Sequence, residues 1–379
     1  MKTIKRVPVQ PSDEEYAASD GTDDRDQRRA RLTSGNKITL GLFFALLALL
    51  VVGSIVKLPY AVMSPGPSVN TLGDTPGTSK PIITVEGLPT YPTDGALKFT
   101  TVRVEGGPGY PVDVWDVLQA WVDPSKDVFP VDDIFDPEVS QEQVAEENAV
   151  QMEGSQEEAT AVALRALGKE VPTYVTVAGL APTSKAKGLL VPKDRFVTVG
   201  ATEITTADSL RDALQQVEPG DPVKLTVERD GKDVTVDVPT IEGPGGRTAL
   251  GISIGLTHDF PAEITIDAGS VGGPSAGLMF SLGIYDKLTP GPLTGNRQVA
   301  GTGTIDDAGK VGAIGGIKQK LAGARAGGAE FFLAPADNCP GVVGAIPDGL
   351  EVFRVATFDE GRAAVEAIAK GRTGALPRC

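Results

Sequence analysis

The chain has 379 residues, of which 41% are hydrophobic, and this is enough for two or more domains with cores of their own. Its formal net charge at pH 7 is −15, which argues against a nucleic-acid-binding protein because such a protein needs a basic face. The 46 glycines and 29 prolines indicate many turns.

The N-terminal region predicts a membrane anchor. Residues 1–37 mix charges with Ser, Asp and Gly, which is typical of a disordered tail. A transmembrane helix is expected over 38–57, because residues 38–56 are uncharged and mostly apolar and are long enough to cross a bilayer. Basic residues gather before this span, which places the tail in the cytoplasm and residues 58–379 outside the cell membrane. The alternative is a cleaved signal peptide, but Ala61-Val62-Met63 lacks the small-x-small cleavage pattern.

The part beyond the span is strongly acidic. The tail up to residue 37 carries a net +1, which leaves −16 for the remainder, and a solubilising surface is the simplest reason for this charge. Both cysteines, Cys339 and Cys379, lie in this exported part. An oxidising compartment permits a disulfide between them, although two cysteines do not prove one.

Residues 58–171 are expected to form an N-terminal portion of the folded part. A Pro/Gly-rich stretch over 58–80 leads away from the span. The alternating segment 96–105 predicts a strand, and a helical pattern follows around 140–168.

Residues 172–243 read as two strand regions, a helix at 206–217 with Thr206 or Asp208 as its cap, and a hairpin around Asp230-Gly231. This order resembles a PDZ domain of the bacterial protease-associated kind. The matching pieces are Gly188-Leu189, Lys193-Asp194 where the family usually has Gly-Asp, and Pro219-Gly220-Asp221. The resemblance implies that an extended peptide adds to an exposed strand edge beside the helix. The alternative is a domain that only packs.

The sequence GGPSAG, residues 272–277, stands between a predicted strand and a predicted helix. Pro274 suits a first helical turn, and Ser275 then lies where free backbone N–H groups and the positive end of the helix dipole favour an oxyanion. Gly272 and Gly273 let a substrate backbone approach. The alternative is a capped helix start without chemistry.

A serine nucleophile needs a base, and the chain offers two kinds. The single histidine, His258, could form a triad with Asp259 or Asp267, although its segment reads as a loop. The other candidate is Lys318, in a helix start among apolar neighbours, where desolvation and the helix terminus should lower its pKa. Lys320 fits a solvated surface lysine instead.

GGPSAG, GGIKQK and Thr302-Gly303 together resemble the proteolytic domain of the Lon family, expected here over 244–379. That domain has an α/β (α+β) fold like ribosomal protein S5 domain 2. The resemblance implies that Ser275 is the nucleophile, Lys318 its general base, and Thr302 the residue that orients the lysine. The chain has Val271-Gly272-Gly273 where ATP-dependent members usually have an acidic residue.

No ATPase motif accompanies this domain. The stretch GTIDDAGKV (303–311) has the wrong glycine spacing for a phosphate loop, and Val311 replaces the Mg²⁺-binding Ser/Thr. Because the strand 96–105 and the helix that follows it are typical of an α/β unit, we expect the PDZ module to be inserted into one composite α/β domain. The overall resemblance is to membrane-anchored, PDZ-containing Lon-like proteases of Gram-positive bacteria. It implies an ATP-independent serine endopeptidase acting on unfolded or extended polypeptides, without cofactor or metal, and often a homo-oligomer. The alternative is a catalytically idle, membrane-anchored peptide-binding scaffold.

Overall fold

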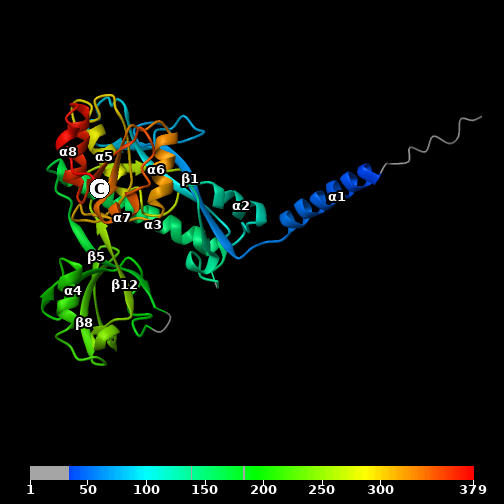
Figure 1. Ribbon diagram of the computed structural model, residues 1–379. Coiled ribbons are helices and arrows are strands. Elements are labelled where there is room, and N and C mark those ends of the chain that lie inside the picture. Colours follow the sequence, from blue (N-terminus) through cyan, green and yellow to red (C-terminus); the bar gives the residue numbers. More distant parts are fainter. Residues whose placement is uncertain (1–33, 138, 182–183) are drawn as a thin grey trace, which may run out of the picture. The chain divides into compact units, whose positions relative to one another are not determined.

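The computed structural model describes residues 34–137, 139–181 and 184–379 (Figure 1). The chain divides into two compact units, one ending at Ile55 and the other running from Val56 to Cys379. Most of the expected tail, residues 1–33, lies outside the described residues.

Helix α1, Ser34–Ile55, has 22 residues and begins four residues before the expected span. It is about 33 Å long at 1.5 Å per residue, which matches the hydrocarbon thickness of a bilayer. Its window Ile38–Ile55 has a mean hydropathy of 2.6, and its large apolar side chains are exposed. It is the one helix among the described residues with the length and apolarity of a span, properties that a signal sequence shares.

The central sheet of the second unit has six strands in the order β18-β17-β14-β3-β1-β4. Strands β3, β14, β17 and β18 run parallel, whereas β1 pairs antiparallel with both β3 and β4. The bounds are β1 Tyr60–Asn70, β3 Ala96–Glu105, β4 Asp127–Pro130, β14 Gln298–Gly301, β17 Phe331–Pro335 and β18 Glu351–Val355.

Helices cover both faces of this sheet. Consecutive strand residues alternate between two cores, so that Leu333 and Phe353 face one layer and Phe332 and Val352 the other. The first layer contains α3 (Gln141–Ala166), α5 (Gly277–Leu288) and α8 (Phe358–Ala369), and the second contains α6 (Ile317–Ala326) and α7 (Cys339–Val342). The expected α/β fold is therefore confirmed.

The sheet combines strands from both ends of the sequence. Strand β3 lies next to β14, with Leu97 opposite Val299, although about two hundred residues separate them. A smaller pair has the same character, because β2 (Ile83–Glu86) pairs with β13 (Glu263–Ile266). The expected insertion of the PDZ module into one composite domain is thus confirmed.

The inserted module has its own sheet, in the order β12-β5-β6-β8-β9, and its own core beneath α4 (Ala207–Leu214). Thr206, not Asp208, is the N-cap of α4. Strand β12 pairs with β5 along its whole length, so the sheet continues beyond the boundary expected at residue 243. The bounds are β5 Thr173–Leu180, β6 Arg195–Val199, β8 Pro222–Arg229, β9 Lys232–Pro239 and β12 Ile252–His258.

The remaining elements are short. They are α2 (Val114–Val122), β7 (Thr202–Glu203), β10 (Ile241–Glu242), β11 (Thr248–Ala249), β15 (Thr304–Ile305) and β16 (Val311–Gly312). A disulfide joins Cys339, at the start of α7, to Cys379 at the end of the sequence. This is the bridge that the sequence permitted without proving.

Candidate active site

Ser275 lies in the loop between β13 and α5, and this loop is held on both sides. The Ser275 carbonyl oxygen accepts hydrogen bonds from the Gly303 N–H at 2.9 Å and the Thr302 hydroxyl at 3.0 Å. From α3, the Ser155 hydroxyl donates to the Pro274 carbonyl at 2.9 Å. Helix α5 begins at Gly277, so Pro274 and Ser275 precede the helix rather than forming its first turn. The serine is therefore fixed just before the N-terminus of α5.

Gly273 and Gly277, on either side of Ser275, are each needed for a different structural reason. Gly273 has a φ of +84°, a conformation that residues with a side chain rarely adopt. A Cβ on Gly277 would stand 2.9 Å from a side-chain carbon of Ile305 and 3.0 Å from the Ser155 hydroxyl. The motif thus allows both a sharp turn and close packing of α5 against β15 and α3.

Lys320, on α6, lies against the serine. Its Nζ is 2.8 Å from the Ser275 Oγ and also donates to the carbonyl oxygen of Thr100, in β3, at 2.8 Å. Thr100 is itself tied to β14, because its hydroxyl donates to the Gly301 carbonyl. The lysine amine is therefore aimed at the serine by the central sheet.

The environment of Lys320 disfavours its charge. Its side chain is almost wholly buried, with the residue 2% exposed. Burial alone lowers the pKa of Lys320 from 10.5 to about 8. A lysine with this pKa has a substantial neutral fraction near physiological pH, and the neutral amine is the form that accepts a proton.

The prediction that Lys318 contacts Ser275 is wrong. The Lys318 Nζ lies 2.6 Å from the Asp127 Oδ1, and the two side chains are 35% and 36% exposed. Gln319 donates to the other oxygen of the same carboxylate. Lys318 is thus a partly exposed, ion-paired lysine, and Lys320, expected at the surface, is the buried one.

Thr302 also differs from its expected place. The residue is fully buried, as an orienting residue should be. Its hydroxyl, however, donates to the Ser275 backbone carbonyl and not to a lysine. It positions the nucleophile loop, while the Thr100 carbonyl takes the place expected for it beside the lysine amine.

His258 belongs to a different cluster. Its Nδ1 lies 2.9 Å from the Thr173 hydroxyl and 3.6 Å from Asp307, and its Nε2 lies 4.0 Å from Glu158. The structure shows neither Asp259 nor Asp267 as its partner and places no contact between His258 and Ser275 among the described residues. The alternative Ser-His-Asp triad therefore has no geometric support.

The helical spacing of apolar residues in α6 predicts that Lys320, and not Lys318, is buried. On α6 the buried positions include Ile317, Leu321 and Ala324, spaced three or four residues apart. Lys320 follows Ile317 by three residues and precedes Ala324 by four, so it lies on the same buried face. Lys318 lies outside this face. The local apolar neighbours of Lys318 in sequence were therefore a weaker signal than the helical spacing.

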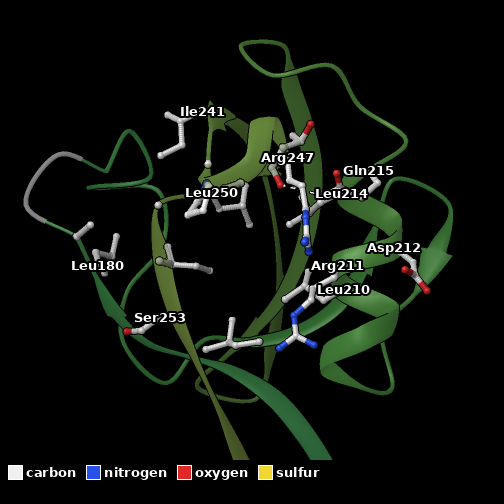
Figure 2. Close-up of a pocket in the computed structure, with 18 of the residues that line it drawn as sticks. Leu180, Leu210, Arg211, Asp212, Leu214, Gln215, Ile241, Arg247, Leu250 and Ser253 are labelled. Carbon is white, nitrogen blue, oxygen red and sulfur yellow. Dashed lines mark hydrogen bonds between the residues drawn. The ribbon is translucent and has the colours of Figure 1, made fainter.

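The inserted module contains a groove of about 1400 Å³ beside α4 (Figure 2). One wall is α4, with Leu210 and Leu214, and the other is β12, with Ile252 and Ile254. Strand β12 is an edge of its sheet, so among the described residues its outer backbone groups have no neighbouring strand. Two arginines, Arg211 and Arg247, also line the groove.

Comparison with known families agrees with this architecture. Residues 249–362 match the C-terminal proteolytic domain of Lon protease (S16), and residues 155–240 match the PDZ domain. The chain carries a Lon proteolytic domain and a PDZ domain. Ser275 and Lys320 both lie in the matched Lon segment.

Curated relatives match over part of the chain. Lon protease 2 of Bacillus subtilis is 36% identical over 102 residues, which is 27% of this chain and 17% of that protein. Lon protease 1 of Sorangium cellulosum is 28% identical over 253 residues, 55% of this chain and 31% of that protein. The chain thus spans less than a third of the length of these Lon proteases.

Solved structures match about a fifth of the chain. The PDZ domain of an SdrC-like protein from Listeria monocytogenes is 18% identical with a TM-score of 0.20, covering 21% of this chain and 86% of that one. A protein of Geobacillus thermodenitrificans is 24% identical with a TM-score of 0.20, covering 21% of this chain and 94% of that one. The assignment of the PDZ domain rests on the family match.

Proposed function

We propose that the protein is a membrane-anchored serine endopeptidase that uses a Ser275–Lys320 dyad and needs no ATP. The observation that carries the proposal is the 2.8 Å contact between the Ser275 Oγ and the Nζ of a buried lysine. Lon homology supports a serine peptidase as the general class. Lys320 takes the role of base that the sequence resemblance gave to Lys318.

The dyad can perform both proton transfers of peptide hydrolysis. Neutral Lys320 keeps its N–H toward the Thr100 carbonyl and turns its lone pair toward Ser275, so it accepts the hydroxyl proton as Oγ attacks the scissile carbonyl. The resulting ammonium gives the proton to the leaving amine, which yields an acyl-serine. Lys320 then activates the water that hydrolyses this ester.

The start of α5 supplies electrostatic stabilisation for the tetrahedral intermediates. Ser275 is two residues before Gly277, the first residue of α5. The Leu278 and Met279 N–H groups already donate to the Gly303 and Ala276 carbonyls, so the proposed oxyanion donors are the N–H groups of Ala276 and Gly277. These donors and the helix dipole favour a negative oxygen near the serine. Thr302 and Gly303 hold the Ser275 carbonyl, which fixes the direction of the turn.

The PDZ groove is proposed to present the substrate. An extended polypeptide would add to the open edge of β12 and place apolar side chains against α4. Strand β12 ends at His258, and its Gly255 and Leu256 line a second, smaller hollow together with Pro274. The residue next to the nucleophile therefore shares a surface with the strand that would hold the peptide.

The anchor and its orientation complete the proposal. The apolar helix α1 and its basic N-terminal flank would keep the tail in the cytoplasm and both domains outside. The Cys339–Cys379 disulfide supports an oxidising location. Assembly into a homo-oligomer is proposed from the Lon resemblance alone.

The test is cleavage of a chemically unfolded protein by the full chain in detergent, without ATP. Wild type should cleave it, Ser275→Ala should not, and added ATP should leave the rate unchanged. Equal peptide binding by both forms without cleavage by either would favour the idle scaffold, the alternative that the PDZ groove supports.

A further inference from the structure

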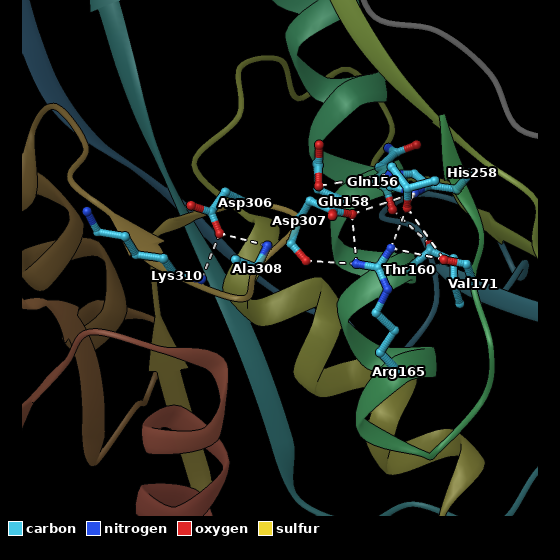
Figure 3. A network of polar contacts seen from close by, with 11 residues as sticks. Gln156, Glu158, Thr160, Arg165, Val171, His258, Asp306, Asp307, Ala308 and Lys310 are labelled. Atoms are coloured by element: carbon cyan, nitrogen blue, oxygen red, sulfur yellow. Dashed lines mark hydrogen bonds and ion pairs between the residues drawn. The ribbon is translucent and has the colours of Figure 1, made fainter. Parts of the chain in front are cut away.

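A polar cluster lies where the last PDZ strand meets the Lon domain (Figure 3). His258 ends β12, Glu158 lies on α3, and Asp307 follows β15. Each of these three residues offers one ligand-type atom, and these atoms lie within 4.8 Å of one another. The dyad does not use this cluster.

The Thr173 hydroxyl contacts one of the two ring nitrogens of His258. Its Nδ1 lies 2.9 Å from the Thr173 Oγ1, and this oxygen already accepts a hydrogen bond from the Arg165 guanidinium. The Thr173 hydroxyl donates to the Val171 carbonyl. In the tautomer that carries its proton on Nδ1, this N–H donates to the Thr173 oxygen. The Nε2 of a neutral His258 then has a bare lone pair.

Within the described part of the chain, this lone pair is buried without a hydrogen bond, which is energetically unfavourable. The His258 side chain is 1% exposed, and its Nε2 has no hydrogen-bond partner among the described residues. The Glu158 Oε2 lies 4.0 Å from it and also lacks a hydrogen-bond partner among the described residues. Two buried polar atoms that face each other without a hydrogen bond cost free energy. An electropositive group between the two atoms would interact favourably with both.

We propose that Glu158, His258 and Asp307 bind one divalent transition-metal ion of the Zn²⁺ type. Zinc bonds to imidazole nitrogen and carboxylate oxygen are about 2.0–2.1 Å long, so two ligand atoms on one tetrahedral ion stand about 3.4 Å apart. The His258 Nε2 and Glu158 Oε2 are 4.0 Å apart and all three ligand atoms lie within 4.8 Å, so binding requires the side chains to close by about 0.6–1.4 Å. One nitrogen and two oxygen ligands suit zinc better than the all-oxygen sites of calcium or magnesium.

Arg165 does not oppose this assignment. It binds one oxygen of Asp307 at 2.7 Å, and the second oxygen of that carboxylate can face an ion. Carboxylates that ligate metals are commonly held by such outer hydrogen bonds, and so are histidines, as the Thr173 contact shows. The carboxylates of Asp306 and Asp307, which both act on Glu158, outnumber the single Arg165 charge, and this negative excess favours a cation.

An ion here would have a structural consequence. It would join the end of β12 to α3 and to the segment that follows β15. On α3, Ser155 lies one turn before Glu158 and holds the Pro274 carbonyl beside the nucleophile. The site would therefore fix the junction between the PDZ groove and the nucleophile loop.

The test is metal binding by the untagged full chain in detergent after removal of metals with a chelator. Dialysis against rising free Zn²⁺, followed by elemental analysis, should give one ion per chain and a raised Tm. Glu158→Gln and His258→Gln should each weaken binding by about 100-fold or more, because each removes a ligand. Asp259→Asn is the matched control next to His258 and should bind as wild type does. Equal zinc content in all four proteins, or none in wild type, would overturn the proposal.

A spectroscopic measurement on wild type keeps the proposal testable if a variant fails to fold. The chain has one histidine, so zinc X-ray absorption should show nitrogen and oxygen neighbours with a single imidazole per ion. Sulfur neighbours, or a shell without imidazole, would contradict the site. None of these readouts depends on peptidase activity, so they stand apart from the proposed function.

Discussion

Replacement of Lys320 by methionine separates the chemical role of the buried amine from its cost to the fold. Methionine has a similar length and no charge, so it can occupy the same space between Ser275 and Thr100. General-base catalysis is worth about 10²–10⁴-fold. Because both half-reactions would use the same amine, we expect Lys320→Met to lower peptidase activity by about 10³-fold or more.

The same change should not destabilise the protein near neutral pH. The pKa of Lys320 is lowered in the folded state from 10.5 to about 8. Below pH 8 the folded chain must hold a buried ammonium, which costs about 3 kcal/mol at 1.36 kcal/mol per unit. This cost shrinks between pH 8 and 10.5 and vanishes above. The substitution also removes two hydrogen bonds, each of which stabilises the fold by about 1 kcal/mol. The free energy of unfolding of Lys320→Met should therefore exceed that of wild type by an amount on the order of 1 kcal/mol at pH 7.

The assay combines peptide cleavage with denaturant unfolding of the full chain at pH 7 and pH 10. Lys318→Met is the matched control: its ion pair with Asp127 is about one third exposed, so activity should stay within a few-fold of wild type and stability within about 1 kcal/mol. Near-wild-type activity of Lys320→Met, or its loss in Lys318→Met, would refute the assignment. A fold much less stable in Lys320→Met at pH 7 would refute the burial argument.

Three further changes test other parts of the structure. Thr302→Val removes one of two donors to the Ser275 carbonyl and should lower kcat by about 10-fold while a Thr302→Ser variant stays active, as steady-state kinetics will show. Cys339→Ser with Cys379→Ser opens a disulfide of sequence separation 40 and should cost about 4 kcal/mol, seen as a lower Tm that reductant no longer changes. Arg247→Glu in the exposed groove lining should raise KM for an unfolded protein by about 10-fold but leave the acylation of Ser275 by a small ester unaltered, whereas equal KM values would argue against a substrate role for the groove.

Much of the fold follows from local sequence patterns. The alternating segment 96–105 and the helix around 140–168 occupy their expected places, because period-two and helical apolar patterns reflect burial directly. The GGPSAG turn lies before a helix as expected, but Pro274 precedes the first helical turn instead of belonging to it. The composite sheet was also expected, since a strand and a helix typical of an α/β unit precede the PDZ module. The edge strand β12 was missed because its pairing with β5 joins segments about eighty residues apart.

The residues of the candidate site could be predicted from the sequence only in part. Ser275 could be identified because GGPSAG places a serine next to glycines just before a predicted helix. The choice between Lys318 and Lys320 depended on elements that sequence proximity does not reveal: Asp127 in β4 pairs with one lysine, and Thr100 in β3 orients the other. A strict helical reading of α6 would have placed Lys320 inside, but a buried unpaired lysine is rare enough that an exposed one was the natural expectation.

The most direct test of the dyad is the pH dependence of Ser275 acylation by a small activated ester, measured by mass spectrometry of the full chain. The rate should rise with pH through an inflection near 8, where Lys320 loses its proton, and level off above it. The inflection should persist in Lys318→Met and disappear in Lys320→Met. A rate that keeps its inflection without Lys320, or loses it without Lys318, would contradict the account.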